Sequence, residues 1–357
     1  MTWFNELMGF EENSPEQVRA NIFISGTEMK SMINGRAYTF GELSIPSLNE
    51  LRDEKLLVGG MLNLSETVAD VKTLHLNQQN EGAVFQVASQ FNLLEMVSPE
   101  ISPEDGVSRY AYDYTQGPAC AIACGAGTIY RNYFVEINEN IGQTSTCQID
   151  CLSNIAEWFD NENHLHWKMK NGYMLPSKSG LEWVTKKILS LEKEKYEELK
   201  GLLRIGVQRN TQVTLNLSSH LVNQVFCSAL PIAYTQIPTT YWEAFARLVL
   251  DATYEATFWV ALQNYIETGN NKLYLTLVGG GAFGNPSSWI KRFAFKKYYQ
   301  IQPHTSRCKN SKLWLLQSCS SRHYNSLHFL QKNSITRFSE FILFHILAVR
   351  LAHFLWR

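Results

Sequence analysis

The sequence has almost no net charge and no surplus of basic residues. It contains 32 Lys and Arg against 33 Asp and Glu, a formal charge of −1 over 357 residues. A general nucleic-acid binder needs a basic surface, so this balance argues against that class. Glycine and proline are too few, and hydrophobic residues at 45% too many, for a disordered chain. The composition therefore predicts a globular protein with a large core, as one large domain or two smaller ones.

A secretory signal and a disulfide framework are also missing. The opening Met1-Thr-Trp-Phe-Asn-Glu6 has neither a basic region nor an apolar stretch. Seven cysteines, an odd number with no dense spacing, favour free thiols in a reducing compartment. The pairs Cys120/Cys124 and Cys147/Cys151 are spaced more widely than zinc ligands usually are. We expect a soluble cytoplasmic protein with no metal, no cofactor, no nucleic-acid partner and no membrane association.

The last sixty residues lack two common amino acids. No Asp follows Asp251 and no Gly follows Gly284, and from residue 300 onward Glu340 is the sole acid against eight Lys or Arg. No helical or strand period persists there, which favours a translated wrong frame or an unspliced segment for residues 298–357. Two alternatives stay open. One is a membrane tail over residues 341–356, which is shorter than the roughly twenty apolar residues a span requires. The other is a genuine local helix or binding segment.

Residues 1–297 read as an alternation of helices and strands. Capping patterns at Ser14 and Ser47 start short helices. A charged helix capped at Ser179 is expected to run to about residue 203. A second helix, capped at Thr240, runs to about residue 268 and is apolar almost all round, so it should be buried against a sheet. Strands are predicted at residues 71–76, 83–88, 204–207, 213–217, 225–230 and 273–278.

This order of elements predicts an α/β fold, a three-layer α/β/α sandwich with an N-terminal helical extension. The predicted domains are an N-terminal accessory segment over residues 1–70, a main domain over residues 71–297, and the atypical tail over residues 298–357. On the second long helix, four charged side chains recur at four-residue spacing and are interpreted as a structural ion-paired row: Glu243, Arg247, Asp251 and Glu255.

A glycine-rich segment, Gly279-Gly-Gly-Ala-Phe-Gly-Asn285, follows the last of these strands and precedes a helix expected near Ser287. Glycines there let backbone N–H groups approach an anion, and the start of the helix adds positive potential. The segment therefore predicts a phosphate or diphosphate site, although a tight strand-to-helix turn without ligand explains it as well. It is neither a Walker A loop nor a Rossmann fingerprint.

Two further stretches carry polar groups in apolar surroundings. Residues 110–134 contain Asp113 followed by Thr115 and Gln116, and each of these needs a partner if buried. A satisfied core turn remains the alternative. Residues 87–92 leave a predicted strand and end in Asn92, with Glu95 close behind. The carboxyl end of a strand is where α/β folds bind ligands.

Together these stretches carry a family resemblance. The motifs, in chain order, are Phe85-Gln-Val-Ala-Ser-Gln-Phe-Asn92, Tyr112-Asp-Tyr-Thr-Gln-Gly-Pro118, Gly127-Thr-Ile-Tyr-Arg-Asn-Tyr133, Val225-Phe-Cys-Ser-Ala-Leu-Pro231 and Leu275-Thr-Leu-Val-Gly-Gly-Gly-Ala-Phe-Gly-Asn285. The chain resembles the divergent macrodomain-like ADP-ribosylhydrolases, the group that includes bacterial effectors, and more distantly the poly(ADP-ribose) glycohydrolases.

The resemblance implies that the loop ending at Asn92 faces the distal ribose of ADP-ribose and that the glycine-rich segment cradles the diphosphate. The implied activity is removal of ADP-ribose from modified protein side chains, at arginine, without a metal in most relatives. The sequence also departs from the family. Ser89-Gln-Phe-Asn92 replaces the usual Asn-Ala-Ala-Asn, and the Gln-Glu-Glu motif of the glycohydrolases is absent. Two alternatives remain: a reader that binds ADP-ribose without turnover, and a truncated product without function.

Cleaving an ADP-ribosyl bond calls for one carboxylate to stabilise charge or activate water and for another acid to protonate the leaving group. Asp113 is the first candidate, followed by Asp105 and Glu95. The expected partners are ADP-ribose and an ADP-ribosylated protein. The expected ligand-binding residues are Gln90, Asn92, Thr115, Gln116, Gly117, Gly279, Gly280, Gly281, Ala282, Phe283, Gly284 and Asn285.

Overall fold

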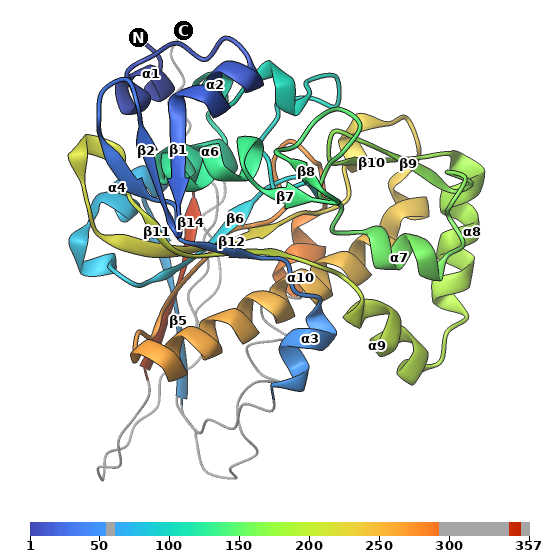
Figure 1. Ribbon diagram of the computed structural model, residues 1–357. Coiled ribbons are helices and arrows are strands. Elements are labelled where there is room, and N and C mark those ends of the chain that lie inside the picture. The colour runs from blue at the N-terminus through green and yellow to red at the C-terminus, as the bar shows by residue number, and fades with distance from the viewer. Residues whose placement is uncertain (55–60, 293–342, 351–357) are drawn as a thin grey trace, which may run out of the picture.

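A seven-stranded mixed sheet forms the centre of the protein (Figure 1). The computed structural model describes residues 1–54, 61–292 and 343–350. In spatial order the strands are β4 (Glu42–Ser44), β11 (Gly206–Gln212), β12 (Leu221–Cys227), β6 (Val84–Ala88), β13 (Lys272–Leu275), β14 (Leu343–Arg350) and β5 (Met61–Val68). From β12 to β5 every neighbouring pair is parallel, whereas β11 is antiparallel to both β12 and β4.

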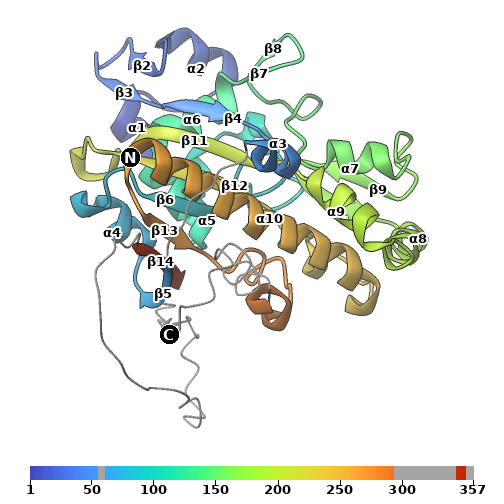
Figure 2. The ribbon, with the colours of Figure 1, turned by 90° about the horizontal axis from the view of Figure 1, so that it is seen from below.

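Helices cover both faces of this sheet. The long helix α10 (Thr239–Thr268) lies along one face (Figure 2), where it packs against α3 (Leu48–Asp53), α8 (Lys178–Leu189) and α9 (Lys193–Gly201). The opposite face carries α5 (Gln116–Ala123) and α6 (Gly125–Tyr133), and α4 (Val71–Leu76) packs against α5. The predicted α/β class and its three-layer arrangement are therefore confirmed, including the burial of the second long helix.

The N-terminal segment contains both helices and strands. Helices α1 (Trp3–Met8) and α2 (Pro15–Asn21) precede a three-stranded antiparallel sheet of β1 (Ile22–Ser25), β2 (Glu28–Ser31) and β3 (Ala37–Thr39). A second hydrophobic core joins this segment to α5 and α6, with Phe4 and Met8 packed among buried residues that include Ala126 and Ile129. The following strands β4 and β5 belong to the central sheet, so the predicted boundary at residue 70 falls between β5 and α4. The domain division stays a prediction.

The remaining elements are short. They are the hairpin of β7 (Glu136–Ile137) and β8 (Asn140–Ile141), helix α7 (Ser153–Trp158), the hairpin of β9 (Trp167–Lys170) and β10 (Tyr173–Pro176), and the 3-10 turns η1 (Gln78–Asn80), η2 (Pro103–Asp105), η3 (Ser108–Tyr112), η4 (Leu215–Leu217) and η5 (Ile232–Tyr234).

Side-chain caps account for the helix starts that the sequence predicts correctly and for one helix start that it misses. Ser14 and Ser47 accept hydrogen bonds from the first turns of α2 and α3, as expected. The strand predicted at residues 71–76 is wrong, because these residues form α4. The Asp70 side chain accepts from the N–H groups of Lys72 and Thr73, which starts a helix, and Val71 and His75 are then buried on one face.

Three other boundaries differ from the predictions. The charged segment 179–203 is two helices, α8 and α9, because α8 is capped by Ser177 and ends at Leu189. The predicted strand at 213–217 contains η4, and β11 and β12 lie on either side of it. Helix α10 begins at Thr239 after Pro238, with no side-chain cap.

Part of the atypical tail lies within the described residues. Strand β14 pairs in parallel with both β13 and β5 and so lies inside the sheet, next to the edge strand β5. The rest of the tail (298–342 and 351–357) lies outside the described residues, as do the ends of the alternative membrane segment. The wrong-frame interpretation stays a prediction.

A buried ion cluster joins α9, α10 and α3. The Lys200 ammonium is fully buried and lies 2.6 Å from Glu197, 3.1 Å from Glu255 and 3.5 Å from Asp251. Arg52 on α3 also pairs with Glu197 and Glu255, at 2.8 and 2.7 Å. The predicted ion-paired row on α10 is thus divided. Arg247 pairs with Glu243 at 2.7 Å, whereas the other two carboxylates pair with cations from neighbouring helices.

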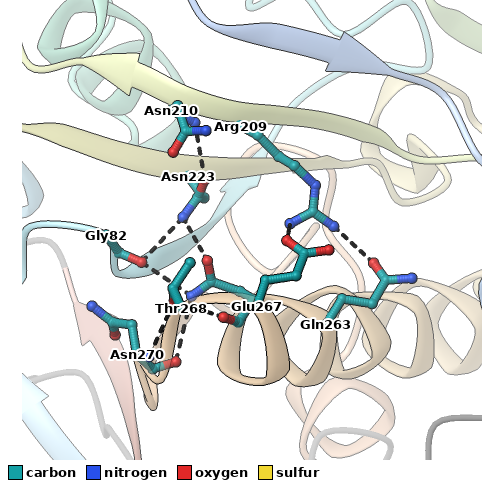
Figure 3. Close-up of polar contacts among 9 residues, drawn as sticks. Gly82, Arg209, Asn210, Asn223, Gln263, Glu267, Thr268 and Asn270 are labelled. Atoms are coloured by element: carbon teal, nitrogen blue, oxygen red, sulfur yellow. Dashed lines mark hydrogen bonds and ion pairs between the residues drawn. The ribbon is translucent and has the colours of Figure 1, made fainter.

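A polar network holds the C-terminal end of α10 against the sheet (Figure 3). The Asn223 amide on β12 donates to the carbonyl of Gly82 at 3.1 Å and to Asn264 at 3.0 Å, and its oxygen accepts from the N–H of Asn210. Arg209 reaches from β11 to Glu267 near the end of α10. This network fixes where β6 starts and thereby helps set where its carboxyl end emerges.

Candidate functional site

A cavity of about 950 Å³ opens at the carboxyl ends of three neighbouring parallel strands, β12, β6 and β13. The strands end at a similar level, since Cys227 of β12 pairs with Ala88 of β6. The chain leaving each strand lines the cavity, and a fourth wall comes from the segment that leads into α5. The three sequence stretches with candidate site residues therefore meet in one space, at the edge where α/β sheets bind ligands.

The loop that leaves β6 is folded back by its own amide side chains. The Gln90 amide pairs with both the N–H and the carbonyl of Met96, at 2.8 and 3.0 Å. The Asn92 oxygen accepts from the N–H of Leu94, and its nitrogen donates to Gln148. Leu93 between them has a φ of +64°, a conformation that non-glycine residues rarely adopt. The result of this tight fold is that Glu95 lies at the cavity wall.

Glu95 is the most unusual titratable group of the site. Its side chain is buried and lines the cavity, and in the described part of the chain its Oε1 atom has no hydrogen-bond partner. Burial raises the pKa of the Glu95 carboxyl well above its ordinary value, and the negative charge of Asp113 raises it further, against an opposing effect from the Arg131 guanidinium. The side chain therefore keeps its proton to a higher pH than an exposed glutamate would.

Arg131 on α6 is a fully buried cation beside this loop. It donates to the carbonyl of Leu93, to Gln208 and to Thr128, and its guanidinium lies 3.7 Å from the centre of the Phe226 ring. Its hydrogen bonds therefore go to neutral groups, while its positive charge acts on the Glu95 carboxyl and opposes the rise of that group's pKa.

The start of α5 packs directly on the end of β6. The Gln116 amide accepts from the N–H of Ala88 at 2.9 Å and donates to the carbonyl of Gln86 at 2.8 Å, as a neighbouring strand would. A Cβ on Gly117 would lie 2.0 Å from the Ala88 carbonyl oxygen and 2.2 Å from Glu95 Oε2. Glycine is required there because α5, β6 and the Glu95 carboxyl approach so closely.

Asp113 stands between two exposed tyrosines at the cavity mouth. It follows η3, and its Oδ1 atom accepts from the N–H of Thr115 at 2.8 Å. Tyr112 and Tyr114 on either side are each 78% exposed, and all three residues line the cavity. The mouth therefore combines a half-buried carboxylate with two aromatic rings that are open to solvent.

The glycine-rich segment forms another part of the cavity wall. Gly279 and Gly284 have φ values of +73° and +72°, so both need glycine. Asn285 braces the turn by donating to the carbonyls of Leu230 and Gly279. Within the described residues the N–H groups of Gly281, Ala282 and Phe283 make no hydrogen bond. A Cβ on Gly281 would meet no atom within 4 Å, so this residue borders open space.

A cation and an aromatic cluster complete the lining. Lys291 lies one helical turn after Ser287 and borders the cavity beside the glycine-rich segment, with no ion pair in the described part of the chain. The rings of Tyr173, Tyr234 and Phe283 lie 5.0 to 5.6 Å apart, centre to centre, on the same lining. Tyr173 comes from the β9–β10 hairpin, for which the sequence offers no site signal.

The structure brings most of the predicted site residues to this cavity. Those that line it are Gln90, Glu95, Asp113, Thr115, Gln116, Gly117, Gly279, Gly280, Gly281, Ala282 and Phe283. The others lie apart from its wall. Asp105 is in η2, where it accepts from the N–H and hydroxyl of Ser102. Asn92 and Asn285 are buried supports of their loops, and Gly284 forms part of the turn. Their roles in binding or catalysis stay predictions.

The described residues hold neither a cluster of metal ligands nor a membrane-spanning helix. No three His, Cys, Asp or Glu side chains there come together as a metal centre would require. No helix in that part of the chain combines the length and the apolar character needed to cross a membrane.

No family model matches the chain, and no curated protein matches its sequence. Among solved structures, the poly(ADP-ribose) glycohydrolase of Deinococcus radiodurans in complex with ADP-ribose is similar, with a TM-score of 0.38 and 9% identity, over 87% of this chain and 88% of that chain. The enzyme of Thermomonospora curvata bound to the inhibitor ADP-HPD has a TM-score of 0.38 and 11% identity, over 84% and 89% of the two chains.

Proposed function

We propose that this protein binds ADP-ribose in the cavity and hydrolyses it from modified protein side chains. The observation that carries the proposal is that free backbone N–H groups of the glycine-rich segment and the buried Glu95 carboxyl border the same space. The N–H groups of Gly281, Ala282 and Phe283, with Lys291 beside them, suit a diphosphate. The Tyr173, Tyr234 and Phe283 rings offer an apolar surface for a base or a ribose. The sequence motifs quoted above point to the same ligand.

The two carboxyl groups of the cavity suit the two roles of glycosidic hydrolysis. Glu95 holds a proton and donates it to the leaving nitrogen as the bond to the anomeric carbon of the ribose breaks. The Asp113 carboxylate accepts a proton from the attacking water, whose oxygen forms the new bond to that carbon. After the reaction Glu95 takes up a proton from solvent and Asp113 releases one, which restores both carboxyl groups for the next cycle.

Arginine is the side chain that this mouth would favour. An ADP-ribosylated arginine still carries a cationic guanidinium, which a carboxylate and exposed tyrosine rings attract. Asp113 with Tyr112 and Tyr114 supplies both. An ester-linked or serine-linked adduct has no positive charge to place there. The relation to the effector ADP-ribosylhydrolases rests on the sequence motifs alone and is part of this proposal.

The experiment is a calorimetric titration of the purified chain with ADP-ribose, with AMP as the comparison ligand, followed by a hydrolysis assay on an arginine-linked substrate. We expect ADP-ribose to bind well above AMP, because AMP lacks the diphosphate. Gly281→Ala places the site: the new methyl group enters open space, so folding should be unchanged while ADP-ribose affinity falls roughly tenfold.

Three results would contradict the proposal in different ways. A folded protein that gives no heat with ADP-ribose lacks the binding function. Full affinity in Gly281→Ala would place the ligand away from this segment. Binding without turnover would make the protein a reader of ADP-ribose rather than a hydrolase.

A further inference from the structure

One carboxylate of the N-terminal segment is bound to the loop that forms the cavity mouth. Glu12 lies between α1 and α2, far in sequence from the cavity. Its Oε1 atom accepts from the N–H of Val107 at 3.0 Å and from the Tyr133 hydroxyl at 2.7 Å, and its Oε2 atom accepts from the N–H of Ser108 at 2.7 Å. Three donors therefore converge on one carboxylate at the start of η3.

The fit around this carboxylate is close. Gly106 has a φ of +86°, and a Cβ there would lie 2.6 Å from Glu12 Oε2. Trp3 adds a second link from the N-terminal segment, since its ring N–H donates to the carbonyl of Val107 at 3.3 Å. The backbone of residues 106–108 is thus fixed from outside the main sheet by two side chains of the first twelve residues.

The segment that Glu12 holds is connected to both carboxyl groups of the cavity. Asp113 follows it in the chain, and Glu95 is hydrogen-bonded to its Tyr110 side chain. The N–H of Asp113 donates to the carbonyl of Tyr110 at 3.2 Å, which places Asp113 at the end of η3. The Tyr110 hydroxyl, buried beneath the loop, accepts from the N–H of Glu95 at 3.0 Å. A shift of η3 would therefore move Asp113 and release the backbone of Glu95.

We infer that Glu12 is a positioning residue: it fixes the loop of residues 106–115 and, through Tyr110 and Asp113, the placing of the two carboxyl groups that act on the substrate. The inference rests on the proposed function for the identity of the reaction. It makes the N-terminal segment an integral part of the site and not an accessory. The hydrogen bonds of Glu12 go to the mouth loop and to Tyr133, away from the glycine-rich segment, so ligand affinity and turnover should respond differently.

The test uses the full chain with Glu12→Ala and Glu12→Gln, and with Glu11→Ala as the control. Glu11 is the exposed neighbour, whose carboxylate accepts from the Asn5 amide within the N-terminal segment. Amide hydrogen exchange is followed by mass spectrometry over residues 95 and 106–115, beside the kinetic constants for hydrolysis and the affinity for ADP-ribose. The exchange measurement needs no ligand and no activity.

For Glu12→Ala we expect exchange over residues 106–115 to rise about tenfold, because the hydrogen bonds that hold this local unit are lost. We expect kcat to fall about tenfold, since the carboxyl groups lose their placing, with KM and ADP-ribose affinity nearly unchanged. Glu12→Gln keeps one acceptor oxygen, so its exchange rate and its kcat should lie between those of Glu12→Ala and the wild type. Glu11→Ala should match the wild type in every measurement.

Unchanged exchange over residues 106–115 in both variants would overturn the inference, as would faster exchange with an unchanged kcat. Unfolding of both variants would overturn it too, because Glu12 would then support the whole fold. If the wild type neither binds nor hydrolyses an ADP-ribosyl substrate, the proposed function fails, and the exchange over residues 106–115 still decides whether Glu12 holds the loop.

Discussion

The Tyr110 hydroxyl accepts a hydrogen bond from the backbone N–H of Glu95 at 3.0 Å. This contact joins two loops that are separate in sequence, one leaving β6 and one leading into α5. Burial raises the pKa of both side chains, so each keeps its proton to a higher pH than it would on the surface. The backbone of Glu95 is thus held by a buried hydroxyl group.

Glu95→Gln should abolish turnover while ADP-ribose still binds. Glutamine keeps the size of the side chain but has no proton to give to the leaving group, and loss of an acid catalyst typically costs about 10²–10⁴-fold in rate. Hydrolysis and calorimetry on the same sample check this. Glu162→Gln, at an exposed position, is the matched control and should behave as the wild type. A variant with wild-type turnover would remove Glu95 from the mechanism.

The pH dependence of turnover follows from the same group. The pKa of Glu95 is raised, and in the proposed mechanism the protonated form is the active one, so kcat should fall as the pH rises through that raised value. The contribution of Glu95 to the free energy of unfolding should also fall as the pH rises. The folded state holds the proton at pH values where the unfolded state has lost it, so this contribution is lost as the pH rises. The measurement is kcat against pH, where a rise toward alkaline pH would contradict the assignment.

A second buried group should destabilise the protein in acid. The His75 ring stacks on Phe85, its Nδ1 lies 2.8 Å from the Val71 carbonyl, and its Nε2 faces the Gln224 amide nitrogen at 3.1 Å. Since the carbonyl can only accept, Nδ1 carries the hydrogen and Nε2 accepts from Gln224, which favours the neutral ring. Burial lowers the pKa of His75 to about 4.

His75 therefore binds a proton in the unfolded chain at pH values where it stays neutral in the folded chain. The free energy of unfolding should fall as the pH drops from about 6.5 to about 4. His75→Phe should flatten this part of the curve of unfolding free energy against pH. The exposed His164→Asn should leave it unchanged. Equal slopes in wild type and His75→Phe would show that another group titrates there.

The sequence predicts the parts of the site that depend on local patterns. The glycine-rich segment can be located because consecutive glycines directly after an apolar strand fit either a tight turn or a close approach of the backbone to a ligand. The strand order then brings it beside the β6 loop. Lys291 and Tyr173 cannot be found in this way. Lys291 is an ordinary helical lysine until the helix is placed beside the cavity, and Tyr173 reaches the site only through the packing of the β9–β10 hairpin.

The wrong predictions of secondary structure also arise because local sequence patterns leave tertiary contacts out. Residues 71–76 contain β-branched and apolar residues that fit a strand, and only the Asp70 cap and the burial of His75 decide for a helix. The sequence predicts Ser179 as the cap of α8, whereas Ser177 accepts the hydrogen bond from Gly180, because two serines two residues apart fit equally well in sequence. Tertiary packing chooses between such alternatives.

Lys291→Met tests the cation of the cavity. We expect ADP-ribose affinity to fall roughly tenfold and to depend less on salt, because a positive charge beside the proposed diphosphate site is lost. Affinity for adenosine, which has no phosphate, should not change. Lys187→Met on the exposed face of α8 is the control. An equal loss for both ligands would mean that the side chain packs against the base rather than pairing with phosphate.

Lys200→Met tests the buried ion cluster and separates stability from function. The ammonium is fully buried among three carboxylates from α9 and α10, so its loss leaves negative charge in the core with one cation fewer. Removing one partner of such a cluster costs about 3–5 kcal/mol of unfolding free energy. Lys195→Met removes an exposed pair with Glu198 and should cost at most about 1 kcal/mol. Chemical denaturation of both variants provides the comparison. Because this cluster lies on the face of the sheet opposite α5, ADP-ribose affinity per folded molecule should stay at the wild-type value, and a loss of affinity in folded Lys200→Met would show that α10 transmits strain to the cavity.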